Sequence, residues 1–446
     1  MCLRLVAAAL LPVAVAIAFA AEAAAQQTCP DSSILILGQD EVDRFPERFP
    51  GCTTIRGNLI VRGAGDSTAI VDLSPLAGLE EVTQSLLLDP DPADGNLDIR
   101  RLASLRGLGS LRRVGKDLKI RGADSLRNLA GLDSLREVGG DVELTSNDSL
   151  LSLRGLGALQ RVGGKLFLGF SPLTDLAGLA ALVSIGGDLD FQALPGLESL
   201  TGLSNLRVVG GTVKIVAHAR LSSLAGLEGL RRVGGRFRLA ECGAVADLDP
   251  LASLAEVGGG LSLVNLSSLA DVTGLGGLGA IGGALTVRGA DALTSLVGLE
   301  GVAAGSITRL ALEDNARLEV CALHNVCTFL AEAPLDSVAV VGNAGSCASV
   351  DSLAARCRIV LPTRGSATRA APRLSPNPTA GPVSVVGGDV VQAVVYDLTG
   401  REVVRPSVRA GRFDLGGLPG GSYVVVLRTA DRRPPTVHHI ARVEPR

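Results

Sequence analysis

The sequence predicts a mainly β repeat solenoid followed by a small antiparallel β-sandwich domain. In the solenoid we expect parallel strands, one for each rung of about 24 residues rich in leucine, joined by short helical turns. Three observations carry this prediction: a valine-glycine marker and a glycine-leucine marker recur at one period, and apolar and polar residues alternate after the first marker. The periodic pattern ends near residue 361, where the composition changes.

Both markers keep the same period through the middle of the chain. The glycine-leucine marker recurs from Gly107 to Gly298, and weaker copies of the rung surround Ile55, Val82 and Val302, which makes about eleven rungs. Repeats with a period between roughly 20 and 50 residues are typical of solenoids. Successive valine-glycine markers are 24, 24, 23, 24, 24, 24 and 24 residues apart: Val114-Gly115, Val138-Gly139, Val162-Gly163, Ile185-Gly186, Val209-Gly210, Val233-Gly234, Val257-Gly258 and Ile281-Gly282.

Each rung contains a pattern typical of a half-buried strand. Residues 117–121, Asp-Leu-Lys-Ile-Arg, alternate with a period of two. The preceding glycines permit backbone angles and close approaches that other residues resist. The L-x-x-L-x-G-L-x-x-L stretch fits a tight turn or short helical segment that places leucines inside. A single rung cannot bury its apolar face, so stacked rungs share a leucine ladder, and strands about 4.8 Å apart give a rod about 50 Å long.

Residues 1–25 have the organisation of a secretory signal peptide. Arg4 precedes an uncharged run over residues 5–20, and the small residues Ala23 and Ala25 offer a cleavage site before Gln26. The run is shorter than the roughly 20 residues of a membrane span. No cysteine follows the cleavage site, which argues against a lipoprotein. We therefore expect an exported chain without a transmembrane segment.

The cysteines predict disulfide caps at both ends of the repeat region. Cys29 and Cys52 lie near the mature N-terminus and are expected to pair, whereas Cys242 stands alone. A second group follows the last rungs: Cys321, Cys327, Cys347 and Cys357. These four can pair in three ways, and the sequence does not choose among them. Zinc binding is the alternative for this group, but no C-x-x-C spacing occurs in it.

Composition argues against several classes of function. A net charge of −3 and a pI near 5.9 argue against nucleic-acid binding. Four histidines leave little material for metal or acid–base sites, and no H-E-x-x-H, G-x-S-x-G or P-loop motif is present. Glycines at 274, 276 and 279 spell a dinucleotide fingerprint, but Gly274 belongs to the repeat marker. The acidic segment 89–96 is either a solvated loop or a calcium site with irregular spacing. We expect no cofactor.

The rung pattern, for example NLAGLDSLREVGGDVEL at 128–144, resembles the receptor L-domain branch of the leucine-rich repeats. The resemblance covers roughly residues 29 to 358, within a solenoid expected over 26–361. Ordinary leucine-rich repeats carry an asparagine ladder after the strand, and the absence of such a ladder from the sequence pattern favours the straighter L-domain rod. The resemblance implies binding or adhesion and transfers no catalytic residue.

Residues 362–373 have the composition of a linker, and the alternating apolar runs of 374–446 predict the β-sandwich. This C-terminal part resembles the type A sorting domain of the type IX secretion system of Bacteroidetes-type bacteria. It departs from that pattern at Leu374, where the family often has an aromatic residue. The resemblance implies passage across the outer membrane by the type IX machinery. The matching positions are Pro376, Asn377, Pro378, Gly381, Tyr396, Asp397, Gly400, Gly421 and Tyr423.

Alternation within the strands places residues in columns on one exposed sheet face. The expected central column is Lys119, Glu143, Phe167, Asp190, Lys214, Arg238, Ser262 and Thr286, flanked by Asp117, Asp141, Lys165, Asp188, Thr212 and Arg236. Our hypothesis is that Phe167 and the basic group Lys214, Arg236 and Arg238 form a binding surface, because repeat proteins commonly bind through a broad sheet face. The alternative is that neighbours such as Lys119 and Glu143 merely pair across strands.

We therefore expect a secreted or cell-surface protein that reaches its destination through the periplasm, binds an unknown protein or surface component, and is not an enzyme. Carbohydrate binding is the closer alternative, although it usually uses aromatic stacking, and the chain has no tryptophan and two tyrosines, both near its C-terminus. An extracellular hydrolase is the second alternative. It would need a nucleophile or a carboxylate pair in a loop that interrupts the repeat.

Overall fold

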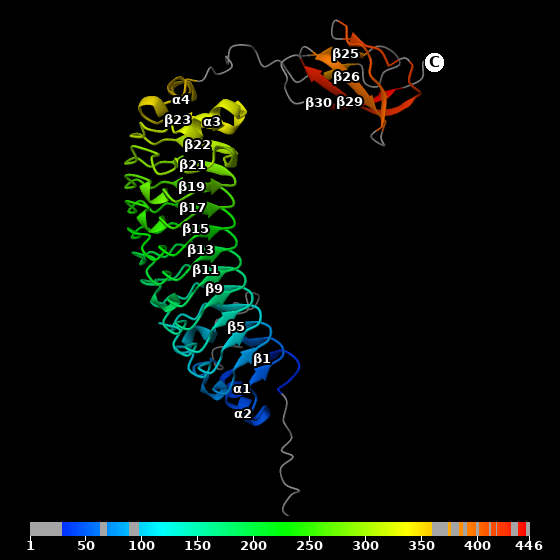
Figure 1. Cartoon of the computed structure of the whole chain (residues 1–446). Helices are drawn as coiled ribbons and strands as arrows, with labels where there is room; N and C mark the ends of the chain where they lie inside the picture. Colours follow the sequence, from blue (N-terminus) through cyan, green and yellow to red (C-terminus); the bar gives the residue numbers. More distant parts are fainter. Residues whose placement is uncertain are drawn as a thin grey trace, which may run out of the picture. The chain divides into compact units, whose positions relative to one another are not determined.

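The computed structural model describes residues 29–62, 69–88, 98–358, 373–375, 383–386, 390–397, 401–409, 412–415, 417–429 and 436–442. The chain divides into two compact units, Met1–Leu361 and Pro362–Arg446. The first is a solenoid of two long parallel sheets with few helices, and the second consists of small antiparallel sheets (Figure 1). The predicted fold class is confirmed.

The larger sheet of the solenoid, here called the long sheet, has thirteen parallel strands within the described residues, stacked in chain order (Figure 1). Two of them, β1 and β23, lie outside the eleven rungs expected from the repeat and belong to the caps. The strands are β1 (Ile34–Ile36), β3 (Leu59–Val61), β5 (Leu86–Leu88), β7 (Leu118–Arg121), β9 (Val142–Thr145), β11 (Leu166–Gly169), β13 (Leu189–Gln192), β15 (Val213–Val216), β17 (Phe237–Ala240), β19 (Leu261–Val264), β21 (Ala284–Arg288), β22 (Arg309–Glu313) and β23 (Val338–Val341).

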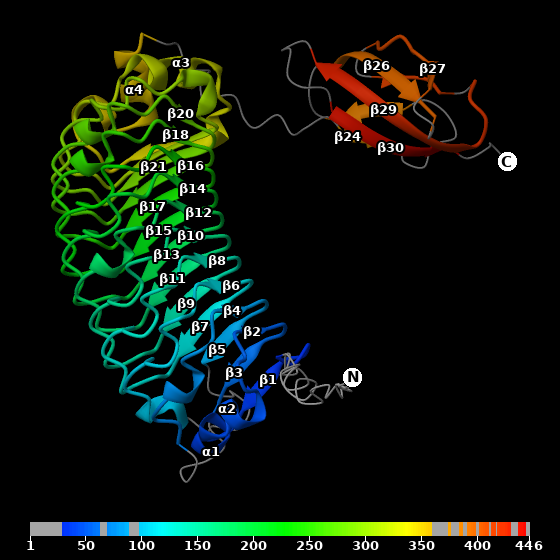
Figure 2. The same ribbon diagram turned by 60° about the horizontal axis from the view of Figure 1, so that its bottom comes forward.

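A second parallel sheet, not expected from the sequence, runs beside the first (Figure 2). The valine or isoleucine of each marker is buried in it, and the following glycines lead the chain into the long sheet. Each rung with a marker therefore contributes two strands rather than one. The second sheet comprises β2 (Thr54–Ile55), β4 (Glu81–Val82), β6 (Arg113–Val114), β8 (Glu137–Val138), β10 (Arg161–Val162), β12 (Ser184–Ile185), β14 (Val208–Val209), β16 (Arg232–Val233), β18 (Glu256–Val257) and β20 (Ala280–Ile281).

Close approach between rungs explains why glycine recurs after the valine. A Cβ atom on Gly163 would lie 2.0 Å from the carbonyl oxygen of Gly139 in the preceding rung. The same close approach recurs in the next rung, where a Cβ atom on Gly186 would lie 2.1 Å from the carbonyl oxygen of Gly163. The glycine of the second marker has a different reason, since Gly131 has φ +116°, a backbone conformation that L side chains rarely adopt.

Leucines fill the space between the two sheets. In one rung Leu129, Leu132, Leu135 and Leu144 are all fully buried, and their counterparts in neighbouring rungs stack on them. Burial of each such side chain contributes roughly 1.5–3 kcal/mol, so the leucine column is the main stabilising element. Between the caps, the described residues that follow each strand of the long sheet and lead to the next rung form turns. Some of these turns form one turn of 3₁₀ helix: Ser74–Leu76, Asp98–Arg101, Ala177–Leu179, Asp249–Leu251, Thr273–Leu275 and Ala304–Ser306.

The expectation that the asparagine ladder is absent is corrected by the structure. The Asn147 side chain accepts from the N–H of Ala123 (3.0 Å) and donates to the carbonyl of Ile120 (3.0 Å) in the preceding rung. Asn315, seven rungs further along the solenoid, makes the equivalent pair of bonds to Ala290 and Val287. Other rungs carry Ser171, His218 or Cys242 at the same position, or an apolar residue, so the ladder is chemically mixed and interrupted.

A left-handed residue directly precedes each ladder position. Ser146 has φ 54°, Ala217 φ 64° and Glu241 φ 57°, conformations that cost non-glycine residues roughly 1–2 kcal/mol. The Ala217 N–H donates to the carbonyl of Ala240 in the next rung (3.1 Å), which helps to hold this conformation. The sharp turn directs the next side chain into the core, where it reaches the backbone of the preceding rung.

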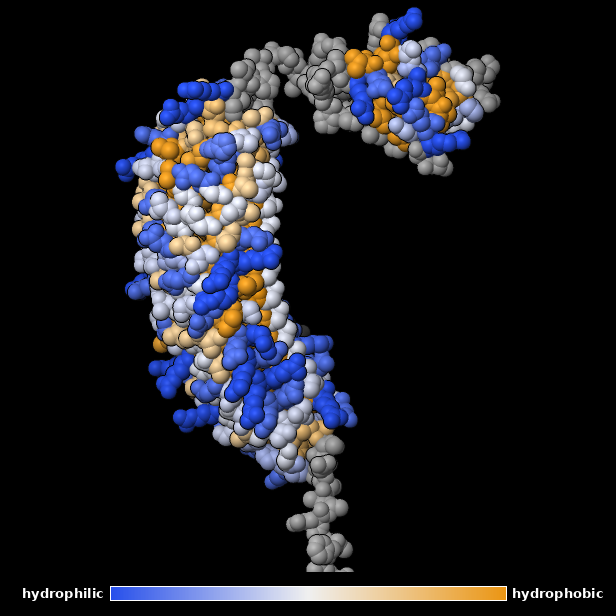
Figure 3. All heavy atoms as spheres, in the orientation of Figure 1, coloured by the Kyte–Doolittle hydropathy of each residue, from blue (hydrophilic) through white to orange (hydrophobic). Residues whose placement is uncertain are grey.

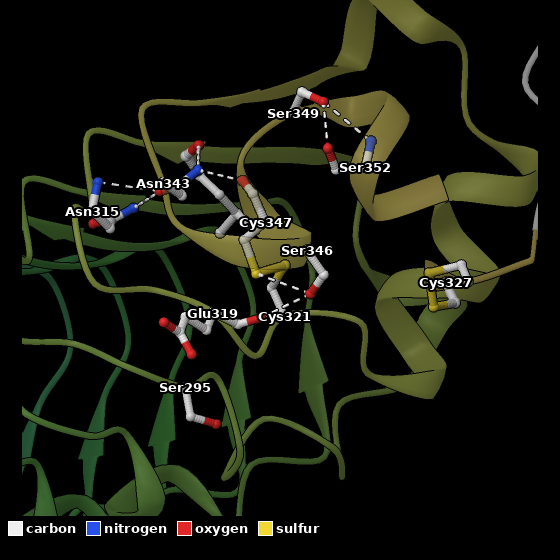
Figure 4. The surroundings of a disulfide bond; sticks show 12 residues. Ser295, Asn315, Glu319, Cys321, Cys327, Asn343, Ser346, Cys347, Ser349 and Ser352 are labelled. Carbon is white, nitrogen blue, oxygen red and sulfur yellow. Dashed lines mark hydrogen bonds between the residues drawn. A yellow bond between two sulfur atoms is a disulfide. The ribbon is translucent and has the colours of Figure 1, made fainter. Parts of the chain in front are cut away.

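Disulfides and short helices close both ends of the solenoid. At the N-terminal end, α1 (Gln39–Asp43) and α2 (Phe45–Arg48) lie beside a Cys29–Cys52 disulfide. At the C-terminal end, α3 (His324–Glu332) and α4 (Val350–Arg356) accompany the disulfides Cys321–Cys347 and Cys327–Cys357. Figure 4 shows the Cys321–Cys347 bridge beneath Asn343, whose side chain donates to the carbonyl of Cys347 (3.0 Å). Cys242 is a free, buried thiol.

The second unit contains two small antiparallel sheets within its described residues. One is formed by β24 (Arg373–Ser375), β25 (Val383–Val386) and β28 (Arg412–Phe413), and the other by β27 (Glu402–Val404), β26 (Val390–Tyr396), β29 (Gly421–Thr429) and β30 (Thr436–Arg442). Tyr423 packs in the core and its hydroxyl donates to the carbonyl of Pro419 (3.0 Å). Asp397 follows Tyr396 at the end of β26 and accepts from the backbone N–H of Arg401 (3.1 Å).

Several predictions fall on residues outside the described ranges. These are the signal peptide at 1–25, the acidic segment 89–96, most of the linker, and the sorting-domain positions Pro376, Asn377, Pro378, Gly381 and Gly400. Among the residues that the structure does describe, no helix combines the length and apolar character needed to cross a membrane.

Candidate functional site

The outward face of the long sheet carries the columns expected from the alternation. The strand register pairs Lys119 with Glu143, then Glu143 with Phe167, and Phe167 with Asp190. The column continues from Asp190 through Lys214 to Arg238. Equivalent residues of successive rungs therefore lie side by side, about 4.8 Å apart, because the strands are parallel and in register.

The aspartates of the flanking column accept hydrogen bonds from backbone N–H groups of the next rung. An Asp117 carboxylate oxygen accepts from the N–H of Asp141 (3.0 Å), and Asp141 in turn accepts from the N–H of Lys165 (2.7 Å). Asp188 accepts from the N–H of Thr212 (2.6 Å). These hydrogen bonds fix each carboxylate at the residue directly before a strand, which explains why aspartate recurs at this position.

Two sets of ion pairs involve the central column, one with three residues and one with two. In the first, Glu143 lies 3.9 Å from the Lys119 ammonium and 2.6 Å from the Arg121 guanidinium. In the second, Asp190 lies 3.7 Å from Lys214. Pairing of neighbours across strands thus accounts for Lys119, Glu143 and Asp190, as the alternative to our binding hypothesis expects.

Phe167 does not lie beside the basic group. Its ring is covered by the Lys165 ammonium, 4.7 Å from the ring centroid, and its edge lies over Gly169. Three strand steps separate Phe167 from Arg238, and the Asp190–Lys214 pair lies between them. The structure therefore brings together only part of the expected surface.

The basic part of the expected surface is retained. Lys214, Arg236 and Arg238, here called the basic cluster, line a depression of about 650 Å³ on the sheet face. Among the described residues no carboxylate forms an ion pair with Arg236 or Arg238, whereas Lys214 keeps its contact with Asp190. In Figure 3 hydrophilic residues gather over the middle and lower parts of the solenoid, and paler surface lies above them.

Sequence reasoning missed the continuation of this surface. Arg236 and Arg238 also line a second depression, of about 440 Å³, which extends over β19, β21 and β22 to Arg288 and Arg309. Its base is made mostly of small residues, Gly260, Ser262, Ala284, Thr286 and Ala311, and Val264 also lines it. The sequence did contain a signal for this surface. After Arg238 the outward columns carry small residues at positions that are charged in earlier rungs.

The groups with shifted pKa values in the middle of the solenoid are buried in the ladder. Burial lowers the pKa of His218, so the ring is neutral, and one tautomer satisfies both of its bonds. Its Nδ1 accepts from the N–H of Leu194 (3.2 Å) and its Nε2 donates to the carbonyl of Phe191 (3.2 Å). Burial also raises the pKa of the neighbouring Cys242 to about 11. Both side chains act as structural bridges between rungs.

In the part of the chain that the structure describes, no group of three or more histidine, cysteine, aspartate or glutamate residues is placed to hold a metal ion. All four C-terminal cysteines, the group for which zinc was the alternative, are paired in the disulfides Cys321–Cys347 and Cys327–Cys357. No family model matches the chain, and a search of curated proteins found no relative.

Proposed function

We propose that this protein is a secreted or cell-surface binding protein, without enzymatic activity, that engages a protein or surface component through the face of the long sheet. The observation that carries the proposal is the basic cluster, where two guanidinium groups project from neighbouring positions of a rigid sheet without an ion-pair partner among the described residues. Unpaired cations on a preorganised surface attract anionic partners and accelerate association.

The disulfide-closed ends support a location outside the cytoplasm. Disulfides persist in oxidising compartments and are rare in reducing ones, and this solenoid has one at its N-terminal end and two at its C-terminal end. With the signal-peptide pattern of residues 1–25 and the sorting-domain resemblance of 374–446, they favour export through the periplasm by the type IX machinery.

Charge reversal tests the binding face. Lys214, Arg236 and Arg238 are changed together to Glu, and association with the purified partner is measured as a function of salt. Association should slow by at least tenfold and lose most of its salt dependence. The matched control reverses three exposed arginines beside the second sheet, Arg112, Arg136 and Arg231, which changes the net charge equally. Equal loss of binding in both variants would indicate a non-specific charge effect and contradict the proposal.

Truncation after residue 361 tests the export route. The solenoid has its own core and caps, so the shortened chain should fold. Without 374–446 it should accumulate in the periplasm of a host that has the type IX machinery, whereas the full chain should reach the surface or medium. Normal appearance of the truncated chain outside the cell would refute the sorting assignment.

A further inference from the structure

The second depression on the sheet face has a small-residue base between two groups of arginines. We call it the small-residue hollow and define it by Gly260, Ser262, Ala284, Thr286 and Ala311. Gly260 is buried and the other four are half-buried, so no long side chain rises from the base. A ligand can therefore approach close to the sheet itself, over β19, β21 and β22.

Charge is concentrated at the two ends of this hollow. Arg236 and Arg238 stand at the β17 end, and Arg288 and Arg309 stand at the β21–β22 end. Glu313 is the one acidic residue in the lining, 3.9 Å from Arg288. Within the described residues Arg236, Arg238 and Arg309 form no ion pair. Arg288 also lies 3.6 Å from Asp314, so two carboxylates balance its charge. The net positive charge of the hollow therefore comes from Arg236 and Arg238 at one end and from Arg309 at the other.

The register fixes the distance between the two ends. Arg236 aligns with Gly260, then with Ala284, and Ala284 pairs with Arg309. Arg236 and Arg309 are thus three strand steps apart, about 14 Å at about 4.8 Å per step. An extended peptide rises about 3.3 Å per residue, so four residues span about 13 Å. Residues i and i+4 of such a peptide also point to the same side, whereas i and i+3 point to opposite sides.

We propose that the small-residue hollow binds an acidic segment of a partner polypeptide, in an extended conformation along the stack of strands, with two carboxylates four residues apart. One carboxylate contacts Arg236 and Arg238, and the other contacts Arg309. The peptide backbone lies over the small-residue base, where the hydroxyls of Ser262 and Thr286 offer hydrogen bonds. This inference rests on the proposed function and names the chemistry of its partner.

The lining favours a peptide over an acidic polysaccharide. Binding sites for sugar rings usually present an aromatic ring for stacking, and the hollow contains none. The nearest aromatic of the central column is Phe167, which lies four strand steps from Ser262 and is covered by Lys165. Arginine at both ends suits carboxylates, because its planar guanidinium forms paired hydrogen bonds with them.

Labelled synthetic peptides test the spacing with the full mature protein. One ten-residue Gly/Ser peptide carries Glu at positions 3 and 7, a second carries Glu at 3 and 6, and a third carries Gln at 3 and 7. Fluorescence anisotropy at low salt should give at least tenfold tighter binding for the first peptide than for the other two. Equal binding of the two Glu peptides, or tighter binding of the uronic acid polymer polygalacturonate than of the first peptide, would overturn the assignment.

Three variants locate the site. Arg309→Gln should weaken binding of the first peptide about tenfold, and Ala311→Tyr, which fills the hollow without changing its charge, should weaken it at least as much. Arg231→Gln, an exposed arginine beside the second sheet, is the control and should leave binding unchanged. Circular dichroism and the melting temperature establish that each variant is folded.

The outcomes separate this inference from the proposed function. If the triple reversal of the basic cluster abolishes binding of the purified partner but Arg309→Gln and Ala311→Tyr leave peptide binding intact, the sheet face binds and the hollow is not the peptide site. If neither the triple reversal nor the hollow variants alter binding, both proposals fail.

Discussion

Replacing Gly163 with alanine should separate two neighbouring rungs. The added Cβ would lie 2.0 Å from the carbonyl oxygen of Gly139 and 2.8 Å from its carbonyl carbon. An ordinary van der Waals contact needs at least about 3.4 Å, so the rungs must move apart by about 1.4 Å. The hydrogen bond from the Gly163 N–H to the Val138 carbonyl, now 2.8 Å, would then be broken.

The expected cost combines two effects. Overpacking of a close-packed interior costs about 1–3 kcal/mol, and each lost backbone bond adds about 1 kcal/mol. We expect Gly163→Ala to lower the free energy of unfolding by about 3 kcal/mol. Gly157→Ala is the matched control in the same rung, because a Cβ at Gly157 meets nothing within 4 Å. There the loss of chain entropy in the unfolded state should leave stability unchanged or raise it by up to about 1 kcal/mol.

Urea unfolding followed by circular dichroism measures the difference, and amide hydrogen exchange locates it. Because each rung contacts only its neighbours, faster exchange should be confined to β8–β12 and the adjoining strands of the long sheet. If Gly163→Ala and Gly157→Ala unfold at the same urea concentration, contact between the glycines does not set the rung spacing.

The remaining predictions concern the caps, the ladder and the C-terminal unit. Replacing Cys29 and Cys52 by serine should lower stability by about 3 kcal/mol, with the fastest amide exchange in β1–β5 and not in the C-terminal cap. Burial lowers the pKa of His218 below the ordinary value of 6.5 in the folded protein. As the pH falls below 6.5, the unfolded chain therefore takes up a proton before the folded chain does. The free energy of unfolding should then fall by up to about 1.4 kcal/mol per pH unit. His218→Asn keeps the ladder bonds and should remove this part of the pH dependence; identical pH profiles would contradict a neutral buried ring. Tyr423→Phe leaves the carbonyl of Pro419 without its donor and should lower the melting temperature of the C-terminal unit. An unchanged melting temperature in calorimetry would disprove this prediction.

The period of the sequence was sufficient to predict the stacking and the columns. Rungs of equal length, stacked in register, bring equivalent residues side by side, so the period alone predicts that Lys119, Glu143 and Asp190 lie in one column. The one short rung does not disturb this register. It omits a residue from a turn, Ser171-Pro172-Leu173 in place of Asn147-Asp148-Ser149-Leu150, and the strands on both sides remain aligned.

Features that leave no distinctive residue pattern were not predictable. Strands of two residues, such as β10, are too short to show alternation, so the second sheet left no separate signal. The ladder was missed because Asn147, His218 and Cys242 share a position and a contact with a carbonyl of the preceding rung but not a chemical type. The covering of Phe167 by Lys165 depends on side-chain conformations, which the residue pattern does not specify.

The constant height of the rungs has a consequence for how this protein can evolve. Because the rungs share one length and one pattern, the insertion or deletion of one whole rung would leave the two sheets continuous. Such an event between β19 and β21 would change the separation of Arg236 and Arg309 by one step of about 4.8 Å. Ligand length would then change in discrete steps of one to two peptide residues, without any new side chain. Descendants of this gene could therefore diverge in the spacing of the acidic groups that they select before they diverge in chemistry.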